Sequence, residues 1–206
     1  MLITFEGIEG CGKTTQIALL YTYLEGKGHR VIKTREPGGT AFGESLRNAF
    51  LHAKMKVYPL SELLVFMAMR AQHVDELVLP ALKEGAIVLC DRFADASYAY
   101  QGYGRGIDLN VIETLNTLVI KGIKPDLTIL LDCPVEKGLT RKAQSTSMDR
   151  FEKEEFSFHR KIKKGYEKLV KEDPKRFFVI DGTLDINTIH KTIRKKVEDL
   201  LKHHGI

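Results

Sequence analysis

Cysteine is scarce in this sequence: three cysteines occur in 206 residues, and no two of them form a CxxC pair. An odd number of isolated thiols does not suit a disulfide-stabilised scaffold or a zinc site, and it fits reduced thiols inside a cell. The chain also lacks an apolar run long enough to span a bilayer, and its first residues do not have the pattern of a signal peptide. We therefore expect a cytoplasmic protein with no membrane partner.

Acidic residues are fewer than basic ones, 27 against 32, which gives a net charge of +5. Such a balance suits nucleic acid, a membrane surface or a phosphorylated small molecule. Much of the excess lies in residues 163–176 and 190–204, which have the pattern of two solvated helix faces, so we expect no specific nucleic-acid partner. The chain lacks internal repeats and low-complexity linkers. Residues 1–206 are therefore predicted to form a single domain.

Short apolar runs alternate with segments of helical periodicity along the whole chain. Continuously apolar strands separated by helices are typical of a parallel sheet covered on both faces, a three-layer α/β fold. Such folds bind ligands at the carboxyl ends of the strands. The expected strands are residues 1–6, 30–34, 86–91, 126–133 and 176–181. The expected helices are residues 13–25, 42–50, 58–82, 109–121, 134–143, 151–172 and 186–203, and residues 92–106 are expected to run from a short helix into a glycine-rich loop.

A glycine-rich segment follows the first expected strand and matches the pattern GxxxxGK[ST]. Glycines let successive N–H groups turn inward around a polyphosphate, and the following helix adds the positive end of its dipole. Lys13 is expected to reach the β- and γ-phosphates of ATP, and the Thr14 hydroxyl to ligate Mg²⁺. The predicted ATP-binding residues are Gly7, Ile8, Glu9, Gly10, Cys11, Gly12, Lys13, Thr14 and Thr15.

A second candidate for the metal site is Asp91, at the end of the apolar run AIVLCD. An aspartate at a strand end often only caps the next helix. Beside a phosphate-binding loop it is expected to hold Mg²⁺, through water.

The class of P-loop protein is suggested by segments that the sequence lacks. The chain has no guanine-reading NKxD segment and no coupling domain of a motor or transport ATPase. A small-molecule kinase fits the size best.

The acceptor of such a kinase is suggested by five arginines in turn-flanked or rim positions. Arginine binds phosphate with a rigid fork of donors, although an exposed ion pair is the alternative for any one of them. Together they indicate an acceptor that already bears phosphate and therefore needs no general base. These residues are Arg35, Arg47, Arg70, Arg92 and Arg105.

Aromatic and amide side chains suggest how a base is recognised. Phe66 and Arg70 are one helical turn apart, so a ring that stacks on a base and a guanidinium that reads its edge project the same way. Phe66 as an ordinary core residue is the alternative. Gln101 follows Tyr98 and Tyr100 and offers both a donor and an acceptor, which suits a pyrimidine edge.

Five segments together resemble the bacterial-type thymidylate kinase family: TFEGIEGCGKTTQ, TREPGGT, FMAMRAQH, DRFADASYAYQG and MDRFE. They occur in the family's order over residues 1–160. The resemblance implies a P-loop fold with a five-stranded parallel sheet, a homodimer, and transfer of the ATP γ-phosphate to dTMP, giving dTDP for dTTP synthesis. Another nucleoside monophosphate kinase, or a deoxynucleoside kinase, is the alternative. A third reading is a regulatory nucleotide-binding protein that does not turn over.

The resemblance also implies roles for individual residues. Phe66 would stack on thymine, with Arg70, Ser97 and Gln101 at the base edge and Tyr100 in the same pocket. Arg47 and Arg92 would approach the dTMP phosphate. Glu9 would bind the sugar 3′-hydroxyl or a nearby water. Glu36 would organise the acceptor site and the waters of the metal ion, and Pro37 would set the loop that touches the base. The residues expected to bind substrate are Glu36, Pro37, Arg47, Phe66, Arg70, Arg92, Ser97, Tyr100 and Gln101.

The arginine that neutralises transition-state charge lies in the P-loop of some family members and in a mobile lid of others. Gly10 follows Glu9 here, so the resemblance implies a lid, at about residues 141–150. Arg141, Lys142 and Arg150 are rival candidates for contacting the transferred phosphate, and Arg141 could instead stack on adenine. The expected catalytic set is Lys13, Arg92, Glu9, Arg141 and Arg150.

Overall fold

The computed structural model describes residues 1–143, 150–151 and 153–205. Its centre is a parallel five-stranded sheet with the order β2-β3-β1-β4-β5. The strands are β1 (Leu2–Glu6), β2 (Val31–Arg35), β3 (Ile87–Asp91), β4 (Leu127–Asp132) and β5 (Phe177–Asp181). The predicted five-stranded α/β fold is confirmed, and each strand lies within a residue or two of its expected bounds.

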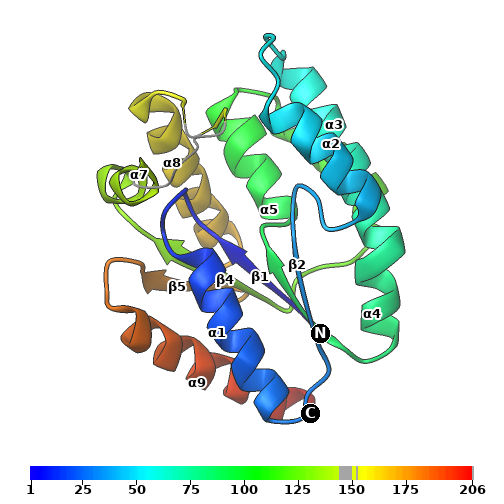
Figure 1. Cartoon of the computed structure of the whole chain (residues 1–206), viewed down its shortest axis with the longest axis vertical. Helices are drawn as coiled ribbons and strands as arrows, with labels where there is room; N and C mark the ends of the chain where they lie inside the picture. Colours follow the sequence, from blue (N-terminus) through cyan, green and yellow to red (C-terminus); the bar gives the residue numbers. More distant parts are fainter. Residues whose placement is uncertain (144–149, 152, 206) are drawn as a thin grey trace.

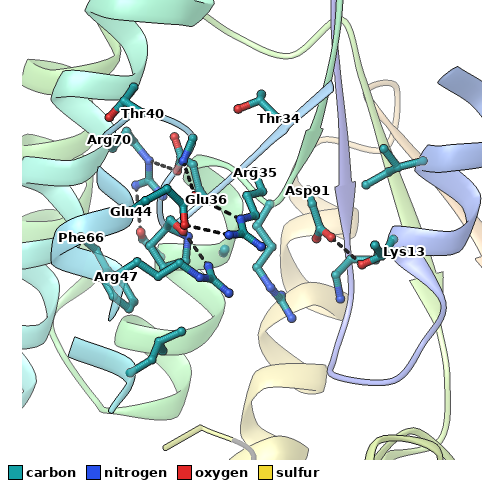
Figure 2. Close-up of a pocket in the computed structure, with 18 of the residues that line it drawn as sticks. Lys13, Thr34, Arg35, Glu36, Thr40, Glu44, Arg47, Phe66, Arg70 and Asp91 are labelled. Atoms are coloured by element: carbon teal, nitrogen blue, oxygen red, sulfur yellow. Dashed lines mark hydrogen bonds and ion pairs between the residues drawn. The ribbon is translucent and has the colours of Figure 1, made fainter. Parts of the chain in front are cut away.

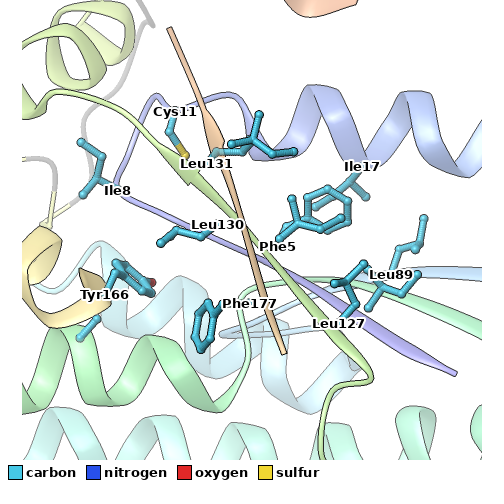
Figure 3. Close-up of a cluster of buried hydrophobic side chains, with 14 of the residues drawn as sticks. Phe5, Ile8, Cys11, Ile17, Leu89, Leu127, Leu130, Leu131, Tyr166 and Phe177 are labelled. Atoms are coloured by element: carbon cyan, nitrogen blue, oxygen red, sulfur yellow. The ribbon is translucent and has the colours of Figure 1, made fainter. Parts of the chain in front are cut away.

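Helices cover both faces of this sheet (Figure 1). The helix α1 (Lys13–Gly26) packs against α9 (Ile186–His204), and both contribute apolar side chains to the main core. Figure 3 shows Ile17 of α1 and Tyr166 of α8 (Phe156–Glu172) on opposite sides of β4. The three central strands β1, β3 and β4 are therefore buried on both faces, which explains why they are mostly apolar, whereas the edge strands β2 and β5 have exposed positions. The remaining α-helices are α2 (Ala41–Leu51), α3 (Pro59–His73), α4 (Leu79–Lys83), α5 (Ala94–Ser97), α6 (Leu109–Ile120) and α7 (Val135–Ala143).

Two helical segments widen into π-helical turns, η1 (Val74–Val78) and η2 (Tyr98–Gly104). The first lies between α3 and α4, so the long helix expected over residues 58–82 is continuous but changes its winding. Pro80 in the first turn of α4 has no N–H to donate and its ring crowds the preceding turn, and the wider π turn accommodates both effects. None of the helices in the described ranges combines the length and the hydropathy that a bilayer span requires.

The expectation of a glycine-rich loop after residue 97 was wrong, because η2 occupies that segment. Its glycines serve close packing: a Cβ at Gly102 would lie 2.5 Å from Leu109 Cδ2, and one at Gly104 would lie 2.7 Å from the Phe158 ring. The helix expected from residue 151 begins instead at Phe156, after Glu155. Phe151 is buried and packs beside Phe50 and Phe66.

The contact between η2 and α8 gives a prediction in which two effects oppose each other. A Cβ at Gly165, in the middle of α8, would lie 2.7 Å from Tyr103 Cδ2 and 3.0 Å from its Cβ. Helix propensity favours alanine over glycine by about 1 kcal/mol, but overpacking costs about 1–3 kcal/mol. We expect Gly165→Ala to lower the free energy of unfolding, measured by urea denaturation.

The matched control is Gly26→Ala at the end of α1, where an added Cβ meets no atom within 4 Å in the described part of the chain. This variant is expected to be neutral or stabilising. A Gly165→Ala protein as stable as the Gly26→Ala protein would show that η2 and α8 are not tightly packed.

Candidate active site

A cavity of about 860 Å³ opens at the carboxyl ends of β1, β2 and β3. Figure 2 shows Lys13 and Asp91 at one end of it and Phe66 and Arg70 at the other. Most of the residues predicted for the site line this one cavity. They are Glu9, Gly10, Lys13, Thr14, Arg35, Glu36, Pro37, Arg47, Phe66, Arg70, Asp91, Arg92, Ser97, Tyr100 and Gln101.

The glycine loop after β1 is a tight turn that packs against α7. Gly7, Gly10 and Gly12 have φ values of 134°, 71° and 100°, which side chains other than glycine rarely adopt. A Cβ at Gly10 would lie 2.0 Å from the Gly138 carbonyl oxygen of α7, so the loop packs directly on that helix. Lys13 Nζ donates to the carbonyls of Gly7 at 3.1 Å and Ile8 at 3.0 Å. The loop therefore folds around the Lys13 ammonium group at the start of α1.

The two residues predicted to hold a metal ion meet at this end of the cavity. The Thr14 hydroxyl donates to Asp91 Oδ2 at 3.0 Å. In the described ranges no three His, Cys, Asp or Glu side chains are grouped as metal ligands. One hydroxyl and one carboxylate beside a phosphate-binding loop fit Mg²⁺, which keeps several waters and takes the rest of its ligands from phosphate oxygens.

Arg92 is the residue that joins the loop to the rest of the site. Its backbone has a φ of 69°, which is unusual for a residue other than glycine. Its guanidinium donates to the Gly7 carbonyl at 2.8 Å and to the Tyr166 hydroxyl at 3.1 Å. The same group donates to Glu9 Oε1 at 3.2 Å and lies over the Tyr100 ring, 4.7 Å from its centroid. Arg92 therefore contacts both the glycine loop and Tyr100, which lines the same cavity.

Glu9 is a largely buried carboxylate of the glycine loop that lies beside Arg92 and Tyr100. Burial opposes its ionisation, but Arg92, the neighbouring His159 ring and the charge of Lys13 hold the pKa of Glu9 well below its ordinary value. The Tyr100 hydroxyl donates to Glu9 Oε1 at 2.5 Å, and His159 Nδ1 lies 3.4 Å from Oε2. Glu9 consequently carries a negative charge at neutral pH and is held on several sides.

The far end of the cavity is aromatic and basic. Phe66 lines the cavity and also packs edge-on against Phe50 at 5.0 Å between ring centroids, so it is both a wall and a core residue. Arg70 is almost fully buried and donates to Glu36 at 2.7 Å, Asn116 at 2.7 Å and Ser97 at 2.9 Å. Its Nη2 also donates to the Phe93 carbonyl at 3.0 Å. Arg70 is therefore fixed in place by its surroundings.

Glu36 acts on the site through Arg70. It accepts from Arg70 Nε and lies 2.9 Å from His73 Nδ1. Burial opposes its ionisation, but Arg70 and His73 hold its pKa below the ordinary value. Arg47 Nη1 donates to the Pro37 carbonyl at 2.6 Å. The loop after β2 is thereby tied to both α2 and α3.

Other predicted residues lie outside this cavity. Gly7, Ile8, Cys11, Gly12 and Thr15 are not among its lining residues. Arg105 is not either, because it pairs with Glu62 and Glu154. Of the predicted lid, residues 144–149 and the side chain of Lys142 lie outside the described residues. Arg141 donates to the Gly182 carbonyl at 3.0 Å, and the Arg150 guanidinium lies 4.6 Å from the Phe50 ring centroid.

Several residues that shape the site were missed from the sequence. Tyr166 and His159 are seven residues apart on α8. The Tyr166 hydroxyl accepts a hydrogen bond from Arg92, and His159 Nδ1 lies 3.4 Å from Glu9 Oε2 of the glycine loop. The Tyr166 hydroxyl, which contacts Arg92, donates to Glu6 Oε2 at 2.6 Å, and Glu6 Oε1 accepts from the Phe93 N–H at 2.8 Å. A carboxylate at the end of the apolar run of β1 was a usable signal for Glu6. The α8 residues carried none, because only the fold brings them here.

The fold, the glycine loop with its lysine, and the arginine-rich cavity beside them define a P-loop phosphotransferase. A family model described as thymidylate kinase matches residues 5–193. The chain is 55% identical over 191 residues to a thymidylate kinase of Trichlorobacter lovleyi, with 89% of this chain and 90% of the relative covered. It is 44% identical over 200 residues to a thymidylate kinase of Caldanaerobacter subterraneus, with 97% and 96% covered.

A solved structure agrees with these relatives. The crystal structure of thymidylate kinase from Ehrlichia chaffeensis superposes with a TM-score of 0.80 at 40% identity, covering 96% of this chain and 98% of that one. The chain belongs to the thymidylate kinase family.

The buried carboxylate of Glu6 gives a pH-dependent prediction. Burial, reinforced by Asp95, raises the pKa of Glu6 from 4.5 to about 7. Between these values the folded state binds more protons than the unfolded state, so the stabilising contribution of Glu6 is full below pH 4.5 and is lost as the pH rises through about 7. At about 1.4 kcal/mol per unit of pKa, the change is on the order of 3 kcal/mol.

Glu6→Gln removes this titration. We expect the stability of the wild type relative to Glu6→Gln to fall between pH 4.5 and 7 and then level off, measured by urea unfolding at each pH. Glu113→Gln removes an exposed carboxylate and serves as the control. Parallel pH profiles for the wild type and Glu6→Gln would contradict the assignment.

Proposed function

We propose that this protein transfers the γ-phosphate of ATP to dTMP, giving dTDP and ADP, the step that supplies dTTP synthesis. The observation that supports this reaction most directly is the position of Arg92. It contacts both the phosphate loop, through Gly7, and the acceptor end of the same cavity, through Tyr100. Membership in the thymidylate kinase family supports dTMP as the acceptor.

On the donor side, the loop from Gly7 to Thr15 binds the phosphates of ATP. Lys13 reaches the β- and γ-phosphates, while Thr14 and Asp91, which lie 3.0 Å apart, would hold Mg²⁺. When bound, Mg²⁺ neutralises charge on the phosphate oxygens. Arg141 lies on this side, because it donates to the carbonyl of Gly182, where an added Cβ would lie 3.3 Å from the Cys11 carbonyl oxygen of the loop. This position supports a contact of Arg141 with ATP.

On the acceptor side, Phe66 stacks on the base and Arg70, Ser97 and Gln101 lie at its edge. Arg47 and Arg92 bind the phosphate of dTMP, which is already ionised at neutral pH and attacks without a general base. Catalysis then rests on positioning and on charge neutralisation by Lys13 and Arg92. Glu9, charged and fixed between the two halves, orients the sugar 3′-hydroxyl. Arg150, over the Phe50 ring beside Phe66, closes this side of the site.

The acceptor panel tests the proposed reaction. ADP release is measured with ATP, Mg²⁺ and dTMP, dUMP, dCMP, dGMP, AMP or thymidine side by side. We expect fast turnover with dTMP and little with the purine nucleotides or thymidine. Preference for thymidine would contradict the phosphorylated acceptor. Preference for a purine nucleotide would point to another nucleoside monophosphate kinase, and binding of ATP without any turnover would indicate a regulatory protein.

The protein is also proposed to be a homodimer. Helices α3 and α6 pack on each other through Leu63, Met67, Ile112 and Val119. They leave large apolar side chains exposed beside this contact, at Leu60, Leu64, Val111 and Leu118. A twofold axis places the same patch of two copies face to face, which is the commonest way to cover such a surface.

The site needs no nucleic acid or membrane, and the three buried free thiols support a cytoplasmic location.

A charge on this apolar patch should separate the subunits. Leu118 is 72% exposed, so Leu118→Lys is tolerated by the fold but places an ammonium group in the interface. We expect the wild type to sediment as a dimer and Leu118→Lys as a monomer at the same concentration. Leu184→Lys, at a position 45% exposed outside both helices, is the control and should stay dimeric. A monomeric wild type would contradict this interface.

A further inference from the structure

Gln101 is the amide at the base end of the cavity, and its orientation is set from behind. Its side chain lines the cavity but is almost fully buried, and Nε2 donates to Glu62 Oε1 at 2.9 Å. Glu62 is completely buried on α3 and does not line the cavity. It precedes Phe66 by one helical turn and Arg70 by two, so α3 presents all three along one stripe.

The oxygen that Gln101 contacts acts as an acceptor. Arg105 Nε donates to the same Glu62 Oε1 at 3.2 Å, and a guanidinium has no acceptor to offer. Arg105 is itself held by Glu154 at 2.7 Å. Gln101 must therefore turn its NH₂ group toward Glu62, because two oxygens facing each other would repel. Its carbonyl oxygen is then the end of the amide that is left for the cavity.

Arg70 supplies the opposite polarity beside it. Four of its N–H groups have acceptors among the described residues: Glu36, Ser97, Asn116 and the Phe93 carbonyl. Since a guanidinium has five N–H donors, one Nη2–H remains for the cavity. The base end thus presents one acceptor and one donor. This pair matches the N3–H and O4 of a 4-keto pyrimidine, whereas cytosine shows an acceptor at N3 and a donor at its 4-amino group.

We propose that Glu62 is a specificity-determining residue that acts through Gln101, by fixing the amide so that the site accepts 4-keto pyrimidine nucleotides and rejects cytosine nucleotides. Glu62 is a positioning residue and does not touch the substrate. This inference rests on the proposed function, because it assigns base selection within the same acceptor site.

The test is the ratio of kcat/KM for dTMP to kcat/KM for dCMP, measured on one sample of each variant. A ratio does not depend on the fraction of correctly folded enzyme. Glu62→Met keeps a side chain of similar length but removes the acceptor, so nothing holds the Gln101 amide in one orientation. We expect the ratio to fall at least about tenfold, the smaller end of the discrimination that one hydrogen-bond pattern provides, with a gain for dCMP as well as a loss for dTMP.

Two further variants separate this role from a structural one. In a Gln101→Ala background, Glu62→Met should leave the ratio unchanged, because the amide through which residue 62 acts is gone. Glu154→Gln weakens the other partner of Arg105 but keeps the contact between Glu62 and Gln101, and it should also leave the ratio unchanged.

Each outcome decides the question. An unchanged ratio in Glu62→Met overturns the inference, and so does an equal fall in the Gln101→Ala background. A wild type that turns over dTMP but handles dCMP equally well overturns the inference while the proposed function stands. A wild type with no turnover of any pyrimidine nucleotide defeats the proposed function itself and the inference with it.

Discussion

The position of the Arg92 guanidinium is the constraint on which the rest of the site depends. Strands β1 and β3 are parallel neighbours paired at Phe5 and Asp91, so the loops that follow them leave the sheet side by side. The left-handed backbone at Arg92 then turns its side chain back toward the glycine loop, where it meets Gly7 and Glu9. One side chain thereby joins the glycine loop to Tyr100 in the wall of the cavity, and the Tyr166 hydroxyl of α8 accepts a hydrogen bond from the same guanidinium.

Charge balance keeps these groups in place. Arg92 has Glu9 as its carboxylate partner and Arg70 has Glu36, and both carboxylates are held ionised against the cost of burial. A buried charge without a partner would be strongly destabilising, so each arginine here depends on its acid. The pairs also keep the guanidinium groups oriented before a nucleotide binds, which reduces the reorganisation needed during phosphoryl transfer.

Local patterns in the sequence predicted what local chemistry determines. The apolar runs predicted all five strands, GxxxxGKT predicted the loop, and the strand-end position of Asp91 predicted its meeting with Thr14. Contacts between distant segments were not predictable in this way. Glu62 is an unremarkable helical glutamate until η2 brings Gln101 to it, and Gly104 resembled a flexible loop residue until Phe158 of α8 packed on it. The sequence shows which residues are present, and only the fold shows their partners.

The central claim is tested most directly by single-turnover transfer from ATP to dTMP in Arg92→Lys. An ammonium keeps the positive charge but cannot contact Gly7, Tyr166 and Glu9 at once as the planar guanidinium does. We expect the rate of transfer, measured at saturating ATP and dTMP, to fall by roughly a hundredfold or more, the range for losing one fixed donor at a developing charge. A transfer rate within about threefold of the wild type, well short of that range, would contradict the central claim.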